Sequence, residues 1–137
     1  MSSALVTGWP INDNNFSIEK GKKAIEEFKR VRPYFYGDYY PLTEYNTSNS
    51  VWMAYQFAKA ESKDGIVLVF RRPTCNINTL NVKLKSLEPK VMYEIYYEDY
   101  NISINQIGEK LMQEGLDVKI ADAPGSLLIL YKQLNRD

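Results

Sequence analysis

The sequence predicts a mainly β protein: an antiparallel β-sandwich of about seven to eight strands with Greek-key-like connections, preceded by one amphipathic helix. Three observations support this fold class. Short apolar stretches, several with the two-residue alternation of a half-buried strand, recur from residue 51 onward. Turn-forming Gly, Pro, Asn and Asp residues separate these stretches. The one long segment with a helical apolar stripe precedes all of them, which places a single helix ahead of the strands.

The predicted helix covers residues 17–33 and follows an irregular lead-in, residues 1–16, which has no apolar periodicity. Ser17 or Asp13 could cap its first turn. Pro33 ends it, because the residue before a proline is pushed out of the helical backbone conformation. Apolar side chains fall on one face and charged side chains on the other, as in a helix that packs against a partner. The apolar face consists of Ile18, Ala24, Ile25, Phe28 and Val31.

Seven strands are predicted after the helix. The stretch 66–70 is apolar on both faces, which is expected of a strand in the centre of a sheet. The stretch 80–84 alternates cleanly between apolar and polar residues, which predicts one buried face. A short helix is predicted over residues 108–116, in the sequence GEKLMQEGL. The seven predicted strands are 51–57, 66–70, 80–84, 91–97, 101–105, 116–120 and 127–131.

Composition narrows the possible functions. The chain has 17 basic and 17 acidic residues, so its net charge gives no support for nucleic-acid binding. It has no apolar run of about 18 residues, which argues against a membrane helix, and its start lacks a signal-peptide pattern, which favours the cytoplasm of a bacterium. Cys75 is the only cysteine and there is no histidine, so neither a Cys–His nucleophile pair nor a zinc site is expected. No nucleotide-binding motif is present, and we expect no cofactor.

Catalysis by this chain alone would have to use carboxylates. Glu94, Glu98 and Asp99 are close in sequence, and Glu94 and Glu98 would share a strand face, as a glycosidase pair could. The alternative is that these residues form the solvated face and turn of an amphipathic strand, because charged side chains are seldom buried. We therefore predict no catalytic residue. The basic pair Arg71 and Arg72 ends a predicted strand, where we expect it to pair with a nearby acid.

Aromatic residues make up 13% of the chain, and 11 of them are tyrosines. Tyrosine and tryptophan suit strands, but they can also form a platform on which sugar rings stack. The alternative is that Trp52 and half of the tyrosines pack in the core while the rest cover sheet edges, since large aromatic side chains are mostly buried. The candidates for sugar stacking are Trp9, Trp52, Tyr93, Tyr96, Tyr97 and Tyr100.

Three segments in a fixed order resemble a known family. They are YFYGDYYPLT at residues 34–43, WMAYQF at 52–57 and, after a short polar gap, GIVLVFRR at 65–72. This succession resembles the end of the α-galactosidases of glycoside hydrolase family 36, the melibiase-like enzymes. The segment GEKLMQEGLDVKI, residues 108–120, and the apolar strand after it are also similar to the last domain of that family. The resemblance covers most of residues 17–134.

The resemblance implies a division of the chain after residue 43. Residues 1–43 would be a lead-in and the last helix of a catalytic (β/α)8 barrel, and residues 44–137 the C-terminal β-sandwich domain. The two catalytic aspartates of the family lie in barrel motifs that this sequence lacks, so the resemblance implies no catalytic, cofactor or metal-binding residue here. It implies a non-catalytic domain that packs on and stabilises the barrel of a parent enzyme, which hydrolyses terminal α-galactosides.

Two other roles remain open from the sequence. The excess of tyrosine would suit a carbohydrate-binding module, and the cluster of Glu94, Glu98 and Asp99 would have to serve an independent hydrolase. The apolar face of the helix also needs a partner, because burying each large apolar side chain is worth roughly 1.5–3 kcal/mol. Without a barrel, that face would repack on the sandwich or on another chain, so a homo-oligomer through the helix or a sheet edge is a further expectation.

Overall fold

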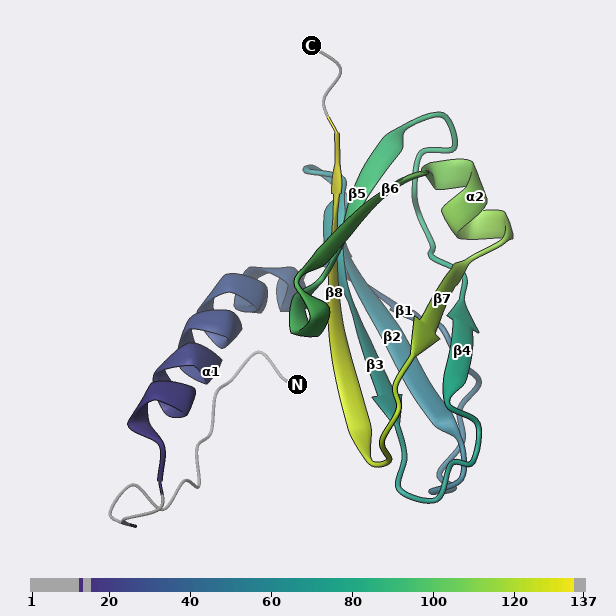
Figure 1. Cartoon of the computed structure of the whole chain (residues 1–137). Helices are drawn as coiled ribbons and strands as arrows, with labels where there is room; N and C mark the ends of the chain where they lie inside the picture. Colours follow the sequence, from purple (N-terminus) through teal and green to yellow (C-terminus); the bar gives the residue numbers. More distant parts are fainter. Residues whose placement is uncertain (1–12, 14–15, 135–137) are drawn as a thin grey trace.

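The computed structural model describes Asp13 and residues 16–134, and its elements are labelled in Figure 1. The helices are α1 (Ile18–Val31) and α2 (Gly108–Gln113), and the short 3-10 helices are η1 (Arg32–Tyr36) and η2 (Glu98–Tyr100). The strands are β1 (Asp38–Pro41), β2 (Trp52–Lys59), β3 (Asp64–Arg71), β4 (Thr79–Val82), β5 (Met92–Tyr97), β6 (Ile102–Ile107), β7 (Leu116–Lys119) and β8 (Gly125–Gln133).

The strands form two antiparallel sheets in the described part of the chain. The larger sheet has six strands in the order β1–β2–β3–β8–β5–β6, and β4 pairs with β7 in the smaller one. The last strand, β8, lies between β3 and β5. The six-stranded sheet is therefore complete only when β8 has paired with both of these strands. Figure 1 shows the smaller sheet and α2 on one side of the larger sheet and α1 on the other. The predicted fold class, a mainly β antiparallel sandwich behind one helix, is confirmed.

Strand β1 is the element that the sequence prediction missed. It pairs with β2 at the edge of the larger sheet, where Tyr39 lies opposite Phe57 and Pro41 opposite Tyr55. Proline lacks the N–H that a central strand needs, so within sheets it occurs at edges such as this one. The proline made the segment resemble a turn, and for that reason the strand was not predicted. The sheet therefore begins at Asp38, ahead of the predicted division after residue 43.

Helix α1 begins as predicted but ends differently. The Ser17 side chain accepts a hydrogen bond of 3.3 Å from the backbone N–H of Lys20, so Ser17 is the cap. Pro33 does not stop the chain from coiling: α1 ends at Val31 and the tighter helix η1 continues to Tyr36. Proline is tolerated in the first turn of a helix, where its missing N–H is not needed. The predicted lead-in, including Trp9, lies outside the described residues except for Asp13 and Phe16.

The main hydrophobic core lies between the two sheets. The alternation of β2 turns Trp52, Ala54 and Ala58 toward this core, together with the polar Gln56. The rings of Tyr93 and Tyr131 meet there edge to face, with centroids 6.2 Å apart. The other core side chains are Val67, Val69, Cys75, Val82, Leu84, Leu87, Ile95, Leu111, Leu116, Val118, Ile120, Leu127 and Ile129.

The opposite face of the larger sheet, called here the outer face, is also apolar. Ile66, Leu68 and Leu128 are buried on it beneath Val31, the last residue of α1. An antiparallel sheet commonly leaves one face to solvent, and that face is then polar. An apolar outer face therefore indicates a surface that something covers. No helix in the described part of the chain has the length and apolarity to cross a membrane.

Candidate functional site

The three carboxylates considered for catalysis bind three different partners. Glu94 lies on β5 and forms an ion pair with Lys132, at 2.8 Å between Oε2 and Nζ. Glu98 pairs with Arg30 of α1 at 2.5 Å, and Asp99 accepts a hydrogen bond of 3.2 Å from the backbone N–H of Leu128. The prediction that Glu94 and Glu98 share a strand face is wrong, because β5 ends at Tyr97 and Glu98 begins the 3-10 helix η2. Glu94 lines one pocket, and Glu98 and Asp99 line another together with Glu27 of α1.

The four tyrosines considered for sugar stacking do not form one platform. The alternation of β5 turns Tyr93 and Tyr97 toward the core, and Tyr93 is 0% exposed. Tyr97 stacks on Tyr100 with centroids 6.4 Å apart. Only Tyr96 lies on the outer face of the sheet, where it lines a pocket. Trp52 is buried in the core, and its Nε1 donates a hydrogen bond of 3.0 Å to the carbonyl of Ile77.

Five aromatic side chains cover the β1–β2–β3 half of the outer face, and we call them the aromatic face. The Phe35 ring of η1 packs edge to face on Phe57, with centroids 5.0 Å apart. Tyr55 lies 5.8 Å from Tyr39 and stacks on Phe70 at 5.9 Å, measured between ring centroids. Tyr39 remains 57% exposed and the others are half-buried. The aromatic face consists of Phe35, Tyr39, Tyr55, Phe57 and Phe70.

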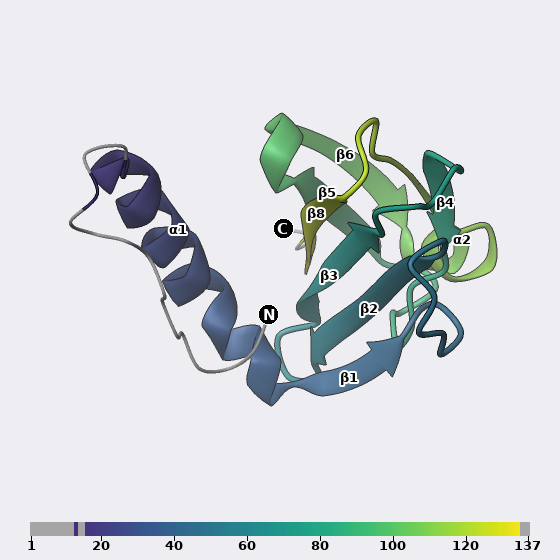
Figure 2. The same cartoon turned by 90° about the horizontal axis from the view of Figure 1, so that it is seen from below.

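Helix α1 projects away from the sheet beside this surface. Figure 2 shows it meeting the sheet only at its C-terminal end. Val31 is buried there, and Arg30 reaches Glu98 of η2. At the other end of the helix Ile18, on the predicted apolar face, is 60% exposed. The apolar face of α1 is therefore covered at its C-terminal end, where Val31 packs over β3 and β8 and Phe28 is buried, and exposed at Ile18. An amphipathic helix gains most of its stability from packing its apolar face, so the exposed part is available for a further contact.

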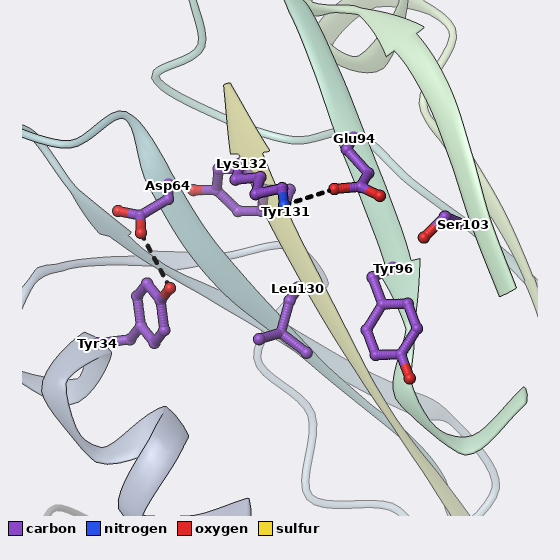
Figure 3. A pocket seen from close by; sticks show the side chains of 8 residues that line it. All are labelled: Tyr34, Asp64, Glu94, Tyr96, Ser103, Leu130, Tyr131 and Lys132. Carbon is purple, nitrogen blue, oxygen red and sulfur yellow. Dashed lines mark hydrogen bonds and ion pairs between the residues drawn. The ribbon is translucent and has the colours of Figure 1, made fainter. Parts of the chain in front are cut away.

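A pocket of about 380 Å³ opens on the other half of the outer face (Figure 3). Residues of η1, of the start of β3, and of β5, β6 and β8 surround it. Figure 3 shows the Leu130 side chain between the rings of Tyr34 and Tyr96. Asp64 and the Glu94–Lys132 pair lie along one edge of the same space. The pocket is lined by Tyr34, Asp64, Glu94, Tyr96, Ser103, Leu130, Tyr131 and Lys132.

The polar groups of this pocket are linked to one another. The Tyr34 hydroxyl donates a hydrogen bond of 2.9 Å to Asp64 Oδ2. Burial, and to a smaller extent this hydrogen bond, raises the pKa of Tyr34 to about 12, so it stays a neutral phenol. Hydrogen bonds from Lys132 and from Ser103 lower the pKa of Glu94 below its ordinary value, so it is ionised at neutral pH. The pocket thus holds ionised carboxylate beside neutral hydroxyl groups.

Arg71 and Arg72, the basic pair at the end of β3, donate hydrogen bonds to backbone carbonyls. The predicted acidic partner is not observed among the described residues. Arg71 is buried and forms no ion pair within the described chain. Its Nε and Nη2 donate to the carbonyl of Cys75 at 3.1 and 2.8 Å, and its Nη1 to those of Ile120 and Ala121 at 2.9 and 2.6 Å. Arg72 instead donates from Nη1 to the carbonyls of Asn46 and Ser48, each at 2.6 Å. Backbone acceptors carry no sequence signature, which is why the sequence suggested an acid.

Metal chemistry finds no support in the described residues, which bring together no group of three or more acidic or cysteine side chains able to hold an ion. Cys75 is buried in the core, and its thiol donates a weak hydrogen bond of 3.4 Å to the carbonyl of Ile77. A buried thiol of this kind acts as a small packing residue. The two features that remain as candidates for function are the aromatic face and the pocket beside it.

Together, the fold and these two features define a small antiparallel β-sandwich whose larger sheet carries the main core on one face, and an aromatic surface beside a polar pocket on the other. A scan against models of protein families found no match, and a search of curated proteins found none either. Solved structures do contain this fold, and those it matches include α-galactosidases of glycoside hydrolase family 36. The resemblance drawn from the three sequence segments is thereby confirmed at the level of the fold.

Three of these structures illustrate the match. An α-galactosidase from Lactobacillus brevis aligns with a TM-score of 0.70 and 18% identity over 90% of this chain. The α-galactosidase AgaB from Geobacillus stearothermophilus aligns with a TM-score of 0.69 and 22% identity over 88%. The galactosidase domain of the α-galactosidase–sucrose kinase AgaSK aligns with a TM-score of 0.63 and 19% identity over 88%. The chain spans only 18%, 16% and 17% of their respective lengths.

Proposed function

We propose that this chain is a non-catalytic accessory domain of an α-galactosidase-type glycoside hydrolase. In this proposal the lead-in and α1 belong to the end of a catalytic (β/α)8 barrel. The part of the chain that forms the sheets, which begins at Asp38 and not after residue 43 as predicted, is the C-terminal sandwich that packs on the barrel and stabilises it. The parent enzyme hydrolyses terminal α-galactosides. The observation that carries the proposal is the aromatic face, where Tyr39 is 57% exposed and the described chain buries the other four rings only in part.

The aromatic face has the composition of a protein–protein interface. Contiguous exposed apolar surface is rare on monomeric proteins and marks sites of association. Aromatic residues are enriched at the centres of such interfaces, where they gain from close packing. Burial of the exposed part of Tyr39 and of the half-exposed rings beside it would be favourable by roughly 25 cal/mol for each Å² of apolar surface. The helices of a barrel pack their apolar stripes inward on its strands, so the proposal requires the barrel to present additional apolar side chains where the sandwich docks.

Helix α1 provides a second argument for a barrel partner. It adjoins the aromatic face through Phe35 of η1 and leaves Ile18 largely exposed. If α1 is one of the outer helices of a barrel, its apolar stripe packs on barrel strands and its C-terminal end carries the sandwich. The same contact at Val31 would then fix the angle between barrel and sandwich.

The first test is the reading frame on the 5′ side of the codon for Met1. The proposal requires that it continue in frame and encode a barrel with paired catalytic aspartates. An in-frame stop codon, or an unrelated fold encoded there, would contradict it. The chain itself should show no turnover of an aryl α-galactoside, and activity that disappears in Glu94→Gln would overturn its assignment as non-catalytic.

The second test uses that barrel region, produced separately and titrated with this chain by calorimetry. We expect a one-to-one complex that Tyr39→Glu combined with Phe70→Glu weakens at least about tenfold, because both substitutions place charge in an apolar contact. Ile77→Glu is the matched control, since Ile77 is 65% exposed and lies in the loop between β3 and β4, outside the aromatic face. Equal affinity of the double variant and the control would show that the barrel does not dock there.

A further inference from the structure

We propose that the pocket between η1 and the β8–β5–β6 half of the larger sheet binds a neutral pyranose sugar. The apolar face of the sugar ring would lie on Leu130 between Tyr34 and Tyr96, with its hydroxyl groups on Asp64 and Glu94. This inference does not rest on the proposed docking role. The pocket is built mainly on β5 and β8 and the aromatic face mainly on β2, and the two adjoin at η1 and β3.

The shape and lining of the pocket suit a sugar ring. A pyranose has an apolar C–H face and a rim of hydroxyl groups, and tyrosine combines an apolar ring with a polar tip in the same way. Figure 3 shows the rings of Tyr34 and Tyr96 on either side of Leu130, which makes an apolar floor with two aromatic walls. The volume of about 380 Å³ lies at the small end of the range for ligand sites, roughly 300–1,000 Å³. That is room for a small ligand such as one sugar unit.

The carboxylates keep free acceptor positions for sugar hydroxyl groups. Asp64 accepts hydrogen bonds from the hydroxyls of Tyr34 and Ser62, and Glu94 pairs with Lys132. An ionised carboxylate can accept about four hydrogen bonds, so each keeps at least about two. These internal bonds also hold the carboxylates in position before any ligand arrives, which lowers the entropy cost of binding.

The charges of the pocket favour a neutral ligand over an acidic one. Asp64 and Glu94 contribute two negative charges and Lys132 one positive charge, and Lys132 already pairs with Glu94 at 2.8 Å. Lys59, which lies opposite Asp64 on β2, has its Nζ 4.6 Å from the centre of the Tyr34 ring, so the second cation beside the pocket is held against an aromatic wall and the lining itself keeps a net negative charge. Lys132 Nζ retains donors beyond its bond to Glu94, and these can serve a sugar oxygen.

Titration of the whole chain with methyl α-galactoside, followed by NMR, tests the inference. Parallel titrations use methyl α-glucoside and galacturonic acid. We expect saturable shifts of the Leu130 methyl groups and of residues on β5 and β6, with a dissociation constant in the millimolar range and weaker binding of the acid. The two neutral glycosides differ only in the configuration of one hydroxyl group. A preference for one of them would therefore show that this hydroxyl group contacts the carboxylates. Absence of saturable shifts with every neutral glycoside, or tighter binding of galacturonic acid, would overturn the inference.

Two variants assign the binding to the pocket. Tyr96→Ala removes one aromatic wall, and Glu94→Gln preserves the shape of the side chain while removing its charge, so the second variant remains informative where the first unfolds. Each should weaken binding by about tenfold, as expected for the loss of one good contact. Tyr45→Ala is the control and should bind as the unchanged chain does. Shifts that persist undiminished in Glu94→Gln and in folded Tyr96→Ala would place the sugar elsewhere and refute the assignment.

Discussion

The side chains of Gln56 and Tyr131, 75 positions apart in sequence, meet inside the core with 2.7 Å between Gln56 Nε2 and the Tyr131 hydroxyl. Gln56 is 0% exposed, and its amide also binds both the N–H and the C=O of Lys85, each at 2.8 Å. It therefore connects the larger sheet to the chain that follows β4 in the smaller one. Burial raises the pKa of Tyr131 far above its ordinary value, so the hydroxyl remains neutral.

Replacing Tyr131 by phenylalanine should reduce the free energy of unfolding by about 1–3 kcal/mol, because one N–H of the buried Gln56 amide loses its acceptor. Tyr45→Phe removes the same hydroxyl group from a side chain that is 93% exposed, and it should change stability by less than about 0.5 kcal/mol. Denaturant unfolding with an unchanged m-value measures both. Equal stability of the two variants would mean that Gln56 finds another acceptor.

Gln56 also shows which feature of β2 can be predicted from the sequence and which cannot. The alternation of Val51 to Phe57 correctly separates two faces, but the face that points into the main core carries Gln56, and the more aromatic face points outward. The period of a strand tells which residues share a face and does not tell which face is covered. Here both faces are apolar enough to be buried, so the choice depends on the second sheet, which lies elsewhere in the sequence.

Neighbouring arginines at the end of β3 should differ sharply in their effect on stability. Arg71→Met leaves the buried carbonyls of Cys75, Ile120 and Ala121 without their donor, and a loss of about 3 kcal/mol or more is expected. Arg72→Met breaks hydrogen bonds that are exposed to solvent and should cost less than about 1 kcal/mol. Thermal and denaturant unfolding of the two variants checks the difference. A small effect of Arg71→Met would show that water replaces the guanidinium.

The pocket was only partly predictable from sequence. Glu94 and Tyr96 were singled out for catalysis and stacking, and both do line it, on adjacent outward positions of β5. Their partners Tyr34, Asp64 and Lys132 come from η1, β3 and β8. Only the sheet order, with β8 inserted between β3 and β5, brings these elements together. No local pattern encodes that order, whereas the fold class follows from local alternation and turns.

The junction between α1 and the sheet should depend on Val31. This side chain is fully buried among Ile66, Leu68 and Leu128, so Val31→Ala removes two buried carbon atoms and leaves a cavity. A loss of about 1.5–3 kcal/mol is expected, together with faster hydrogen exchange in the last turn of α1. Ile18→Ala, at a position on the same helix that is 60% exposed, should change neither quantity appreciably. Unchanged exchange in Val31→Ala would show that this contact does not hold the helix.

The acidic surface between α1 and η2 should make stability depend on pH through Glu27. Partial burial, followed by repulsion from Glu98 and Asp99, raises the pKa of Glu27 above its ordinary value of 4.5, while Arg30 opposes the shift. The folded chain therefore holds the proton more tightly than the unfolded chain, and the stability contributed by protonated Glu27 is lost as the pH rises through this raised pKa.

Glu27→Gln removes that charge and should raise the free energy of unfolding at pH 7, by less than about 1 kcal/mol because solvent screens a partly exposed group. At a pH well below 4.5 the carboxyl is protonated in both states, so the variant and the unchanged chain should be equally stable there. Glu26→Gln removes a neighbouring charge from an exposed position of the same helix. A series of denaturant unfolding curves across this pH range compares the three chains. Stabilisation by Glu27→Gln that is equal at both ends of the range, or is matched by Glu26→Gln, would show that the repulsion from η2 is not its cause.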